Sequence, residues 1–159
     1  LIDRRLDIRW LKALNETLER GSIVLAGPSQ DPDGALNTLA RVRRIGPVPF
    51  DHLPDLAAFS DVLIMPYADL PVTRAMQPLK LKEYLATGKP VVASRLPAVN
   101  EWGDCLDVAD SADEFARMVI ERCTSGVPTH QSGARTRLVR EGWSEKARIL
   151  RAILFDASG

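Results

Sequence analysis

Apolar residues follow two alternating patterns along the chain. From Leu6 to Leu18 they recur at intervals of three or four and Gly21 then ends the pattern, which predicts a first helix over residues 6–19. Short, almost purely apolar runs follow, and such runs are typical of strands that are buried on both faces. The predicted strands are 22–26, 42–45, 62–65 and 91–94, with a weaker one at 106–109.

Helical patterns separate these runs, at 35–40, 51–59, 78–86, 110–123, 130–141 and 144–155. Pro78 suits a first helical turn, and Asp110 or Ser111 together with Glu114 can cap the helix that follows. Because a parallel crossover needs a helix-length connection, strands that alternate with helices predict a parallel sheet covered on both faces. We therefore expect residues 1–159 to form a single α/β domain with a doubly wound, mainly parallel, Rossmann-like sheet of about five to six strands.

Composition narrows the function classes. The 21 Lys and Arg residues balance 21 Asp and Glu residues, and this neutrality disfavours a general attraction to nucleic acid. Cys105 and Cys123 are too few and too isolated for a disulfide framework or a zinc site, so we expect a reducing, cytoplasmic setting. The longest apolar run, 62–65, is far shorter than the roughly 20 residues of a transmembrane helix. No candidate loop carries a carboxylate-rich metal motif.

In a doubly wound sheet, ligands bind at the carboxyl ends of the strands, and here the long segment 66–78 follows one such end. It leads into the predicted helix 78–86, whose first backbone N–H groups are unpaired and suit an anion. Lys80 adds a positive charge to that first turn, a placement that favours a bound phosphate. The alternative is that Lys80 pairs with Glu83 on a solvated helix face.

Residues 78–94, with the sequence PLKLKEYLATGKPVVAS, resemble the signature of a known family. The similar family is the C-terminal, donor-binding domain of GT-B glycosyltransferases of the "glycosyltransferase group 1" type. Residues 23–28, 44–48 and 56–62 resemble further strand and loop stations of that family, so the resemblance covers nearly the whole chain. It implies the binding of a nucleoside diphosphate sugar as donor substrate, without a cofactor or a metal.

The resemblance also implies roles for single residues. Glu83 matches the family's glutamate whose carboxylate accepts hydrogen bonds from both ribose hydroxyls. The family binds the diphosphate with backbone amides just before this helix, which correspond to Met76, Gln77 and Leu79, since Pro78 has no N–H. Lys80 is the nearest basic side chain.

Two other parts of the chain complete the implied donor site. Near the amino end, Arg4 or Arg5 matches a basic residue that the family uses on the phosphates, although both can equally be exposed charges at a helix start. The base is held mainly by backbone in the family, which corresponds to the loop from Gly46 to Val48.

The chain departs from the family pattern at two places. Many retaining members carry two glutamates separated by seven residues, and the first, which contacts the transferred sugar, falls on Ala75. Arg74 or Gln77 is then the alternative sugar contact. The family's domain also begins with a central strand, of which only Leu1 and Ile2 can be a remnant, so we expect a longer protein that continues upstream.

These observations together predict the nucleotide-sugar-binding half of a glycosyltransferase of the hexosyltransferase kind. The acceptor, a glycan or a lipid, is then bound by an N-terminal domain, and the isolated chain binds the donor without turnover. A peripheral membrane contact of the whole protein stays open, and we expect no nucleic-acid partner and no transmembrane segment. The alternatives are half of a nucleotide-sugar epimerase, and a degenerate binding module that has lost the ligand.

Overall fold

The computed structural model describes residues 1–77 and 79–156. Its strands form two parallel sheets, one with the order β1-β2 and one with the order β3-β4-β5. The strands are β1 (Ile23–Ala26), β2 (Val42–Gly46), β3 (Leu63–Met65), β4 (Val91–Ser94) and β5 (Asp107–Ala109). The expected α/β class with parallel strands is confirmed, and each predicted strand lies within about one residue of its expected place.

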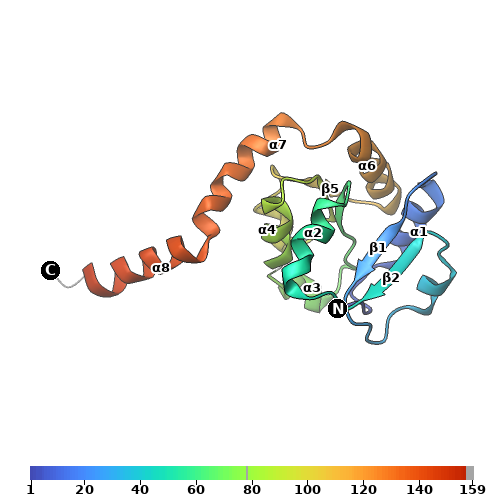
Figure 1. Cartoon of the computed structure of the whole chain (residues 1–159), viewed down its shortest axis with the longest axis horizontal. Coiled ribbons are helices and arrows are strands. Elements are labelled where there is room, and N and C mark those ends of the chain that lie inside the picture. The colour runs from blue at the N-terminus through green and yellow to red at the C-terminus, as the bar shows by residue number, and fades with distance from the viewer. Residues whose placement is uncertain (78, 157–159) are drawn as a thin grey trace.

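Helices connect the strands and extend the chain beyond β5 (Figure 1). The α-helices are α1 (Ile8–Thr17), α2 (Leu53–Ala58), α3 (Pro71–Ala75), α4 (Leu79–Ala86), α5 (Pro97–Asn100), α6 (Ala112–Ser125), α7 (Thr129–Ala134) and α8 (Trp143–Arg151). Tighter turns occupy η1 (Gly34–Thr38), η2 (Phe50–His52) and η3 (Arg135–Glu141), and the π-helical η4 (Ala152–Asp156) follows α8. The start predicted for a helix at Pro78 lies outside the described residues.

Strand β4 is buried on both faces, as a doubly wound sheet requires. Val92 joins one apolar cluster with residues of α1, β1 and α6, whereas Val91 and Ala93 join a second cluster with residues of β3, α4 and α5. The alternation of side chains along a strand places these two clusters on opposite faces. The second cluster is the one that holds α4 in place.

The five strands fall into two sheets, because no strand among the described residues pairs between β1 and β3. The amino-terminal segment forms backbone bridges beyond the carboxyl ends of both sheets. Ile2 forms a parallel bridge with Ser29, after β1, and Leu6 forms an antiparallel bridge with Tyr67, after β3. The segment 1–7 therefore lies at the carboxyl edge between the two sheets.

Two short helices were not predicted from the sequence. The segment 66–78 contains α3, and the segment after β4 contains α5. Both begin with a proline, Pro71 and Pro97, whose fixed φ angle suits a first helical turn. At α3 the buried Thr73 hydroxyl also accepts a hydrogen bond from the backbone N–H of Leu70 at 2.9 Å. Such turns are too short to show a helical period in the sequence.

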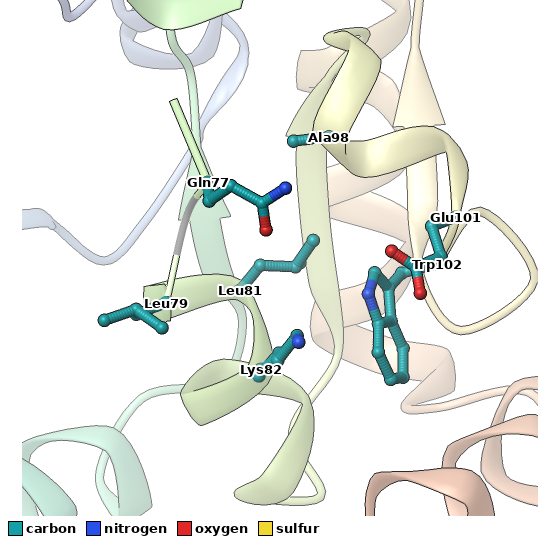
Figure 2. A pocket seen from close by; sticks show the side chains of 7 residues that line it. All are labelled: Gln77, Leu79, Leu81, Lys82, Ala98, Glu101 and Trp102. Atoms are coloured by element: carbon teal, nitrogen blue, oxygen red, sulfur yellow. The ribbon is translucent and has the colours of Figure 1, made fainter. Parts of the chain in front are cut away.

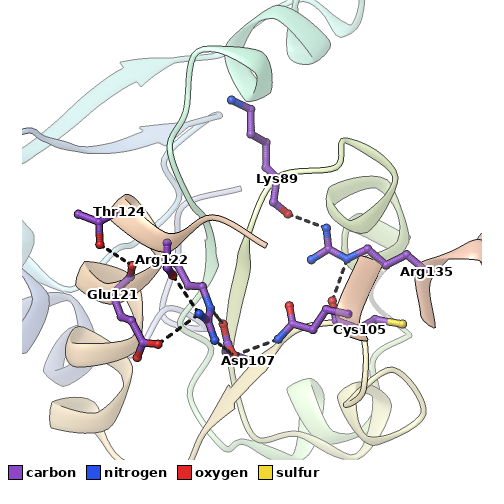
Figure 3. Close-up of polar contacts among 9 residues, drawn as sticks. Lys89, Cys105, Asp107, Glu121, Arg122, Thr124 and Arg135 are labelled. Carbon is purple, nitrogen blue, oxygen red and sulfur yellow. Dashed lines mark hydrogen bonds and ion pairs between the residues drawn. The ribbon is translucent and has the colours of Figure 1, made fainter. Parts of the chain in front are cut away.

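A polar network joins the end of the sheet to the helices that follow (Figure 3). The Arg122 guanidinium of α6 donates to both carboxylate oxygens of Asp107 in β5, at 2.5 and 3.0 Å, and the side-chain amide of Gln131 in α7 donates to the same carboxylate at 3.0 Å. Arg135 donates to the backbone carbonyls of Cys105 and Lys89, at 2.9 and 2.8 Å. These contacts attach α6, α7 and η3 to the three-stranded sheet.

Helix α8 extends away from the rest of the molecule and carries the carboxyl end of the chain (Figure 1). It is amphipathic, and several of its apolar side chains are exposed, including Trp143, Ile149 and Leu150. Over the part of the chain that the structure describes, we find no helix with the length and apolar character needed to cross a membrane.

Candidate functional site

The three longer helices that begin at the carboxyl edge of the sheets, α1, α4 and α6, differ in the chemistry of their first turns. The Asp7 carboxylate caps α1 by accepting from the backbone N–H of Arg9 at 3.0 Å. The Ser111 hydroxyl caps α6 by accepting from the N–H of Glu114 at 3.2 Å, and Glu114 accepts from the N–H of Asp110 at 2.8 Å. The first turn of α4 carries no acidic residue. Of the three, α4 therefore suits an external anion best.

A wide cleft lies beside the ends of β3, β4 and β5 and has a volume of about 540 Å³. The capped ends of α1 and α6 open onto it, with Asp7 and Ser111 in its lining. Arg95 and Asp110, which also line it, are paired with each other. The Arg95 charge is already neutralised by Asp110, and side chains of the protein already cap both helix ends at this cleft. An anion would therefore bind here less well than at the first turn of α4.

The segment just before α4 meets the amino-terminal segment of the chain. The Arg5 guanidinium lies 3.9 Å from the Met76 sulfur. The backbone carbonyl of Arg5 accepts a hydrogen bond from the N–H of Ala68 at 2.8 Å. The Asp3 carboxylate accepts from Arg5 Nε at 2.9 Å and holds the half-buried guanidinium in this place. Burial lowers the pKa of the Leu1 amino group, and the nearby positive charges of Lys80 and Arg5 lower it further. Two of the predicted basic residues are therefore close to the start of α4.

Other basic residues of the region are engaged elsewhere. Arg4 is exposed and pairs with Asp31 at 2.7 Å, away from α4. Arg74 of α3 donates to the Asp69 carboxylate at 2.5 and 2.6 Å. Lys80, in contrast, forms no ion pair with any residue of 1–77 or 79–156. The alternative that Lys80 pairs with Glu83 is not observed.

Glu83 lies on the exposed side of α4, one turn after Lys80. Within the described ranges its carboxylate makes no hydrogen bond and no ion pair. Val48 is half-buried in the loop after β2, where the N–H of Gly27 donates to the carbonyl of Gly46 at 2.7 Å and Gly46 has a φ of 72°. This loop therefore begins beside the end of β1. The structure thus brings Arg5 to Met76, just before the helix that carries Lys80, whereas Val48 lies in the loop after β2 and Arg4 pairs with Asp31.

A small pocket opens on the other flank of α4 (Figure 2). Gln77 and Leu79, both predicted from the sequence, line it. Its other lining residues are Leu81, Lys82, Ala98, Glu101 and Trp102. Sequence reasoning missed Glu101 and Trp102, because only the packing of the unpredicted α5 region near α4 brings them to this place.

Comparison with known proteins identifies the family. Residues 8–124 match the model of the family "Glycosyl transferases group 1". The chain belongs to this family. It is also 32% identical, over 104 residues, to the "Putative teichuronic acid biosynthesis glycosyltransferase TuaH" of Bacillus subtilis (strain 168), a match that covers 63% of this chain and 26% of that protein.

Solved glycosyltransferase structures share the fold of this group 1 chain. Anabaena Alr3699/HepE in complex with UDP and glucose has a TM-score of 0.67 at 19% identity, with 94% of this chain and 44% of that chain covered. AviGT4, a glycosyltransferase of avilamycin A biosynthesis, has a TM-score of 0.61 at 22% identity, with 93% and 49% covered. The chain therefore spans less than half of each of these proteins, and about a quarter of TuaH.

Among residues 1–77 and 79–156, no group of three or more His, Cys, Asp or Glu side chains is placed to hold a metal ion. The positive groups near the start of α4 are the N-terminal end of the helix, Lys80 and Arg5.

Proposed function

We propose that this chain is the donor-binding half of a group 1 glycosyltransferase, which moves a sugar from a nucleoside diphosphate to an acceptor hydroxyl. The observation that carries the proposal is the chemistry of α4. Its first turn has no acid and includes Lys80, for which the described residues supply no ion-pair partner, and the exposed Glu83 carboxylate follows one turn later on the same helix. An anion site beside a free carboxylate suits a ligand that joins phosphates to vicinal hydroxyls.

In the proposed complex the diphosphate lies at the start of α4, close to the backbone of Met76, Gln77 and Leu79. Lys80 and Arg5 neutralise its charge, because both are close to the start of this helix. Neutralisation by fixed cations stabilises the diphosphate as a leaving group. We prefer Arg5 to Arg4 here, because Arg4 is exposed and paired with Asp31.

Glu83 then accepts hydrogen bonds from the two ribose hydroxyls, and the base extends toward the loop from Gly46 to Val48. Hydrogen bonds to a charged acceptor contribute about 1.5–3 kcal/mol each. A carboxylate that no described residue engages can accept two hydroxyl donors at once. The carboxyl end of β2 lies next to that of β1, so this loop belongs to the same sheet edge as the start of the amino-terminal segment.

The whole protein has to supply the rest of the catalytic machinery. The chain covers under half of the related solved structures, and transfer requires acceptor and donor to be held together. We therefore expect the isolated chain to bind the donor without transferring it, and a separate domain to bind a glycan or lipid acceptor. In the described structure one edge of β1 and one edge of β3 have no partner strand.

Titration calorimetry of the chain with UDP, GDP and ADP tests the proposal. One nucleotide should bind, and Glu83→Gln should weaken its binding about tenfold, which corresponds to about 1.4 kcal/mol. Arg5→Gln should also weaken it. Arg20→Gln is the matched control, because Arg20 precedes β1 and so lies at the opposite edge of the sheet.

Circular dichroism of each variant establishes that the chain is folded. A folded chain that binds none of the three nucleotides would contradict the proposal and favour a module that has lost the ligand. Binding that is equally weakened by Glu83→Gln and Arg20→Gln would reject the assignment of the site to α4.

A further inference from the structure

The small pocket beside α4 points to the place of the transferred sugar. Relying on the function proposed above, we infer that Glu101 and Gln77 contact hydroxyl groups of the sugar that the nucleotide carries. Figure 2 shows the Gln77 amide and the Glu101 carboxylate directed toward each other from opposite sides, with Leu81 between them. An amide and a carboxylate around an apolar floor can donate to and accept from hydroxyl groups at the same time.

The position of the pocket follows from helix geometry. Successive residues of an α-helix differ by about 100°, so Lys80 and Lys82 lie on nearly opposite flanks of α4. The amino-terminal segment approaches the Lys80 flank, since Leu1 is within range of Lys80. The pocket lies on the Lys82 flank. A diphosphate at the start of the helix can therefore direct its base toward the first flank and its sugar toward the second.

The charges of the pocket favour neutral hydroxyl groups over a phosphate. Lys82 is held by an ion pair with Glu141 of η3, which Lys146 also contacts at 3.0 Å. The Glu101 carboxylate makes no ion pair within the described residues, and it is the one acidic side chain among the residues that line the pocket. A carboxylate of this kind repels a phosphate and accepts hydrogen bonds from sugar hydroxyls.

Glu101 is held by a rigid support. Trp102, next to it, is only 3% exposed, and the Lys82 and Arg137 cations lie over its ring at 5.6 and 4.7 Å from the centroid. Arg137 also donates to the backbone carbonyl of Glu101 at 2.8 Å. Helix α5 packs against α3, which ends at Ala75 and supplies only a methyl group at that position. Glu101, directly after α5, therefore supplies the carboxylate on the Lys82 side of α4.

The size of the pocket limits what enters it. Its volume is about 40 Å³, room for a few water molecules at the roughly 10–15 Å³ that one needs. A whole sugar ring does not fit, whereas one hydroxyl or hydroxymethyl group does. The contact is thus made with one edge of the sugar, and the configuration of the hydroxyls on that edge determines which donor binds best.

The test compares two ligands on the same protein: the nucleoside diphosphate that binds in the panel above, and its hexose conjugate (UDP-glucose, GDP-mannose or ADP-glucose). Glu101→Gln keeps the shape of the side chain and removes its charge. It should weaken binding of the conjugate about tenfold and change binding of the free diphosphate by less than about twofold. Gln77→Ala should likewise weaken binding of the conjugate more than binding of the free diphosphate. Glu16→Gln, on an exposed face of α1, is the charge-matched control.

A spectroscopic readout accompanies the titration. In NMR spectra, the indole N–H resonance of Trp102 should shift when the conjugate binds, and it should shift less when the free diphosphate binds. If Glu101→Gln and Gln77→Ala weaken both ligands equally, or weaken neither, the inference is wrong while the proposed function stands. If no nucleotide binds to the folded wild-type chain, both fail together. Since Glu101 and Gln77 are exposed, both variants should keep the fold.

Discussion

The Asp107 carboxylate provides a quantitative test of how the sheet is joined to the carboxyl-terminal helices. Its side chain is 11% exposed and that of its partner Arg122 is 15% exposed, so the pair is largely removed from water. Asp107→Ala removes both hydrogen bonds from Arg122 and the one from Gln131, and it leaves the largely buried guanidinium with only the more distant Glu121 carboxylate, at 3.3 Å. Breaking such a pair costs about 3–5 kcal/mol, far more than the loss of an exposed pair.

Urea unfolding followed by circular dichroism measures this loss, and a double-mutant cycle isolates the pairwise contribution. We expect a coupling free energy of about 1.5–3 kcal/mol between Asp107→Ala and Arg122→Ala. The matched control is the Lys12–Glu16 pair on α1, whose side chains are 65% and 62% exposed and whose charged atoms are 3.9 Å apart. That cycle should yield about 0.3–0.5 kcal/mol.

The reasoning is refuted if the two cycles give the same coupling, because burial would then have no effect on the strength of the pair. A change in the denaturant slope with Asp107→Ala would have a different meaning. It would show that α6 and α7 unfold separately from the sheet, so that a two-state free energy no longer applies.

Two further outcomes are expected. The hydrogen bonds from Arg137 lower the pKa of Asp104 from 3.8 to about 2, so the stabilisation by this pair is present above pH 3.8 and is lost as the pH falls through about 2. Carboxyl NMR titration checks this value, and Arg137→Gln should return the pKa toward 3.8; an unchanged pKa in the variant would exclude Arg137 as the cause. Phe115→Ala should lower the free energy of unfolding by about 3–5 kcal/mol, because Phe115 is fully buried and packs edge-on against Trp10. Phe59→Ala, at a side chain that is 89% exposed, should change it by less than about 0.5 kcal/mol, and equal effects would contradict the assigned core.

Much of the fold could be predicted from local patterns. The apolar runs at 62–65 and 91–94 became β3 and β4, and the cap predicted at Ser111 and Glu114 is present at the start of α6. These features depend on neighbours within one or two turns, so the sequence carries their signal directly. The short helices α3 and α5 were missed because each is at most five residues long and shows no period.

The candidate site was predicted in part. Arg5, Met76 and Lys80 were all named from the sequence, and the structure brings them close to the start of α4. The choice between Arg4 and Arg5 could not be made beforehand, because the two residues are adjacent and equally basic. It depends on Asp31 and Asp3, which engage one guanidinium each.

The sequence by itself determined the parallel α/β class, the helix with Lys80 and Glu83, and the similarity to group 1 glycosyltransferases. Each of these follows from the order of residues within a short segment. Only the tertiary structure decided that the strands divide into two sheets and that Glu101 faces Gln77 across a pocket. Those features require segments more than 20 residues apart to meet, and the meeting is determined by the burial of α4 and Trp102 against the sheet rather than by any local pattern.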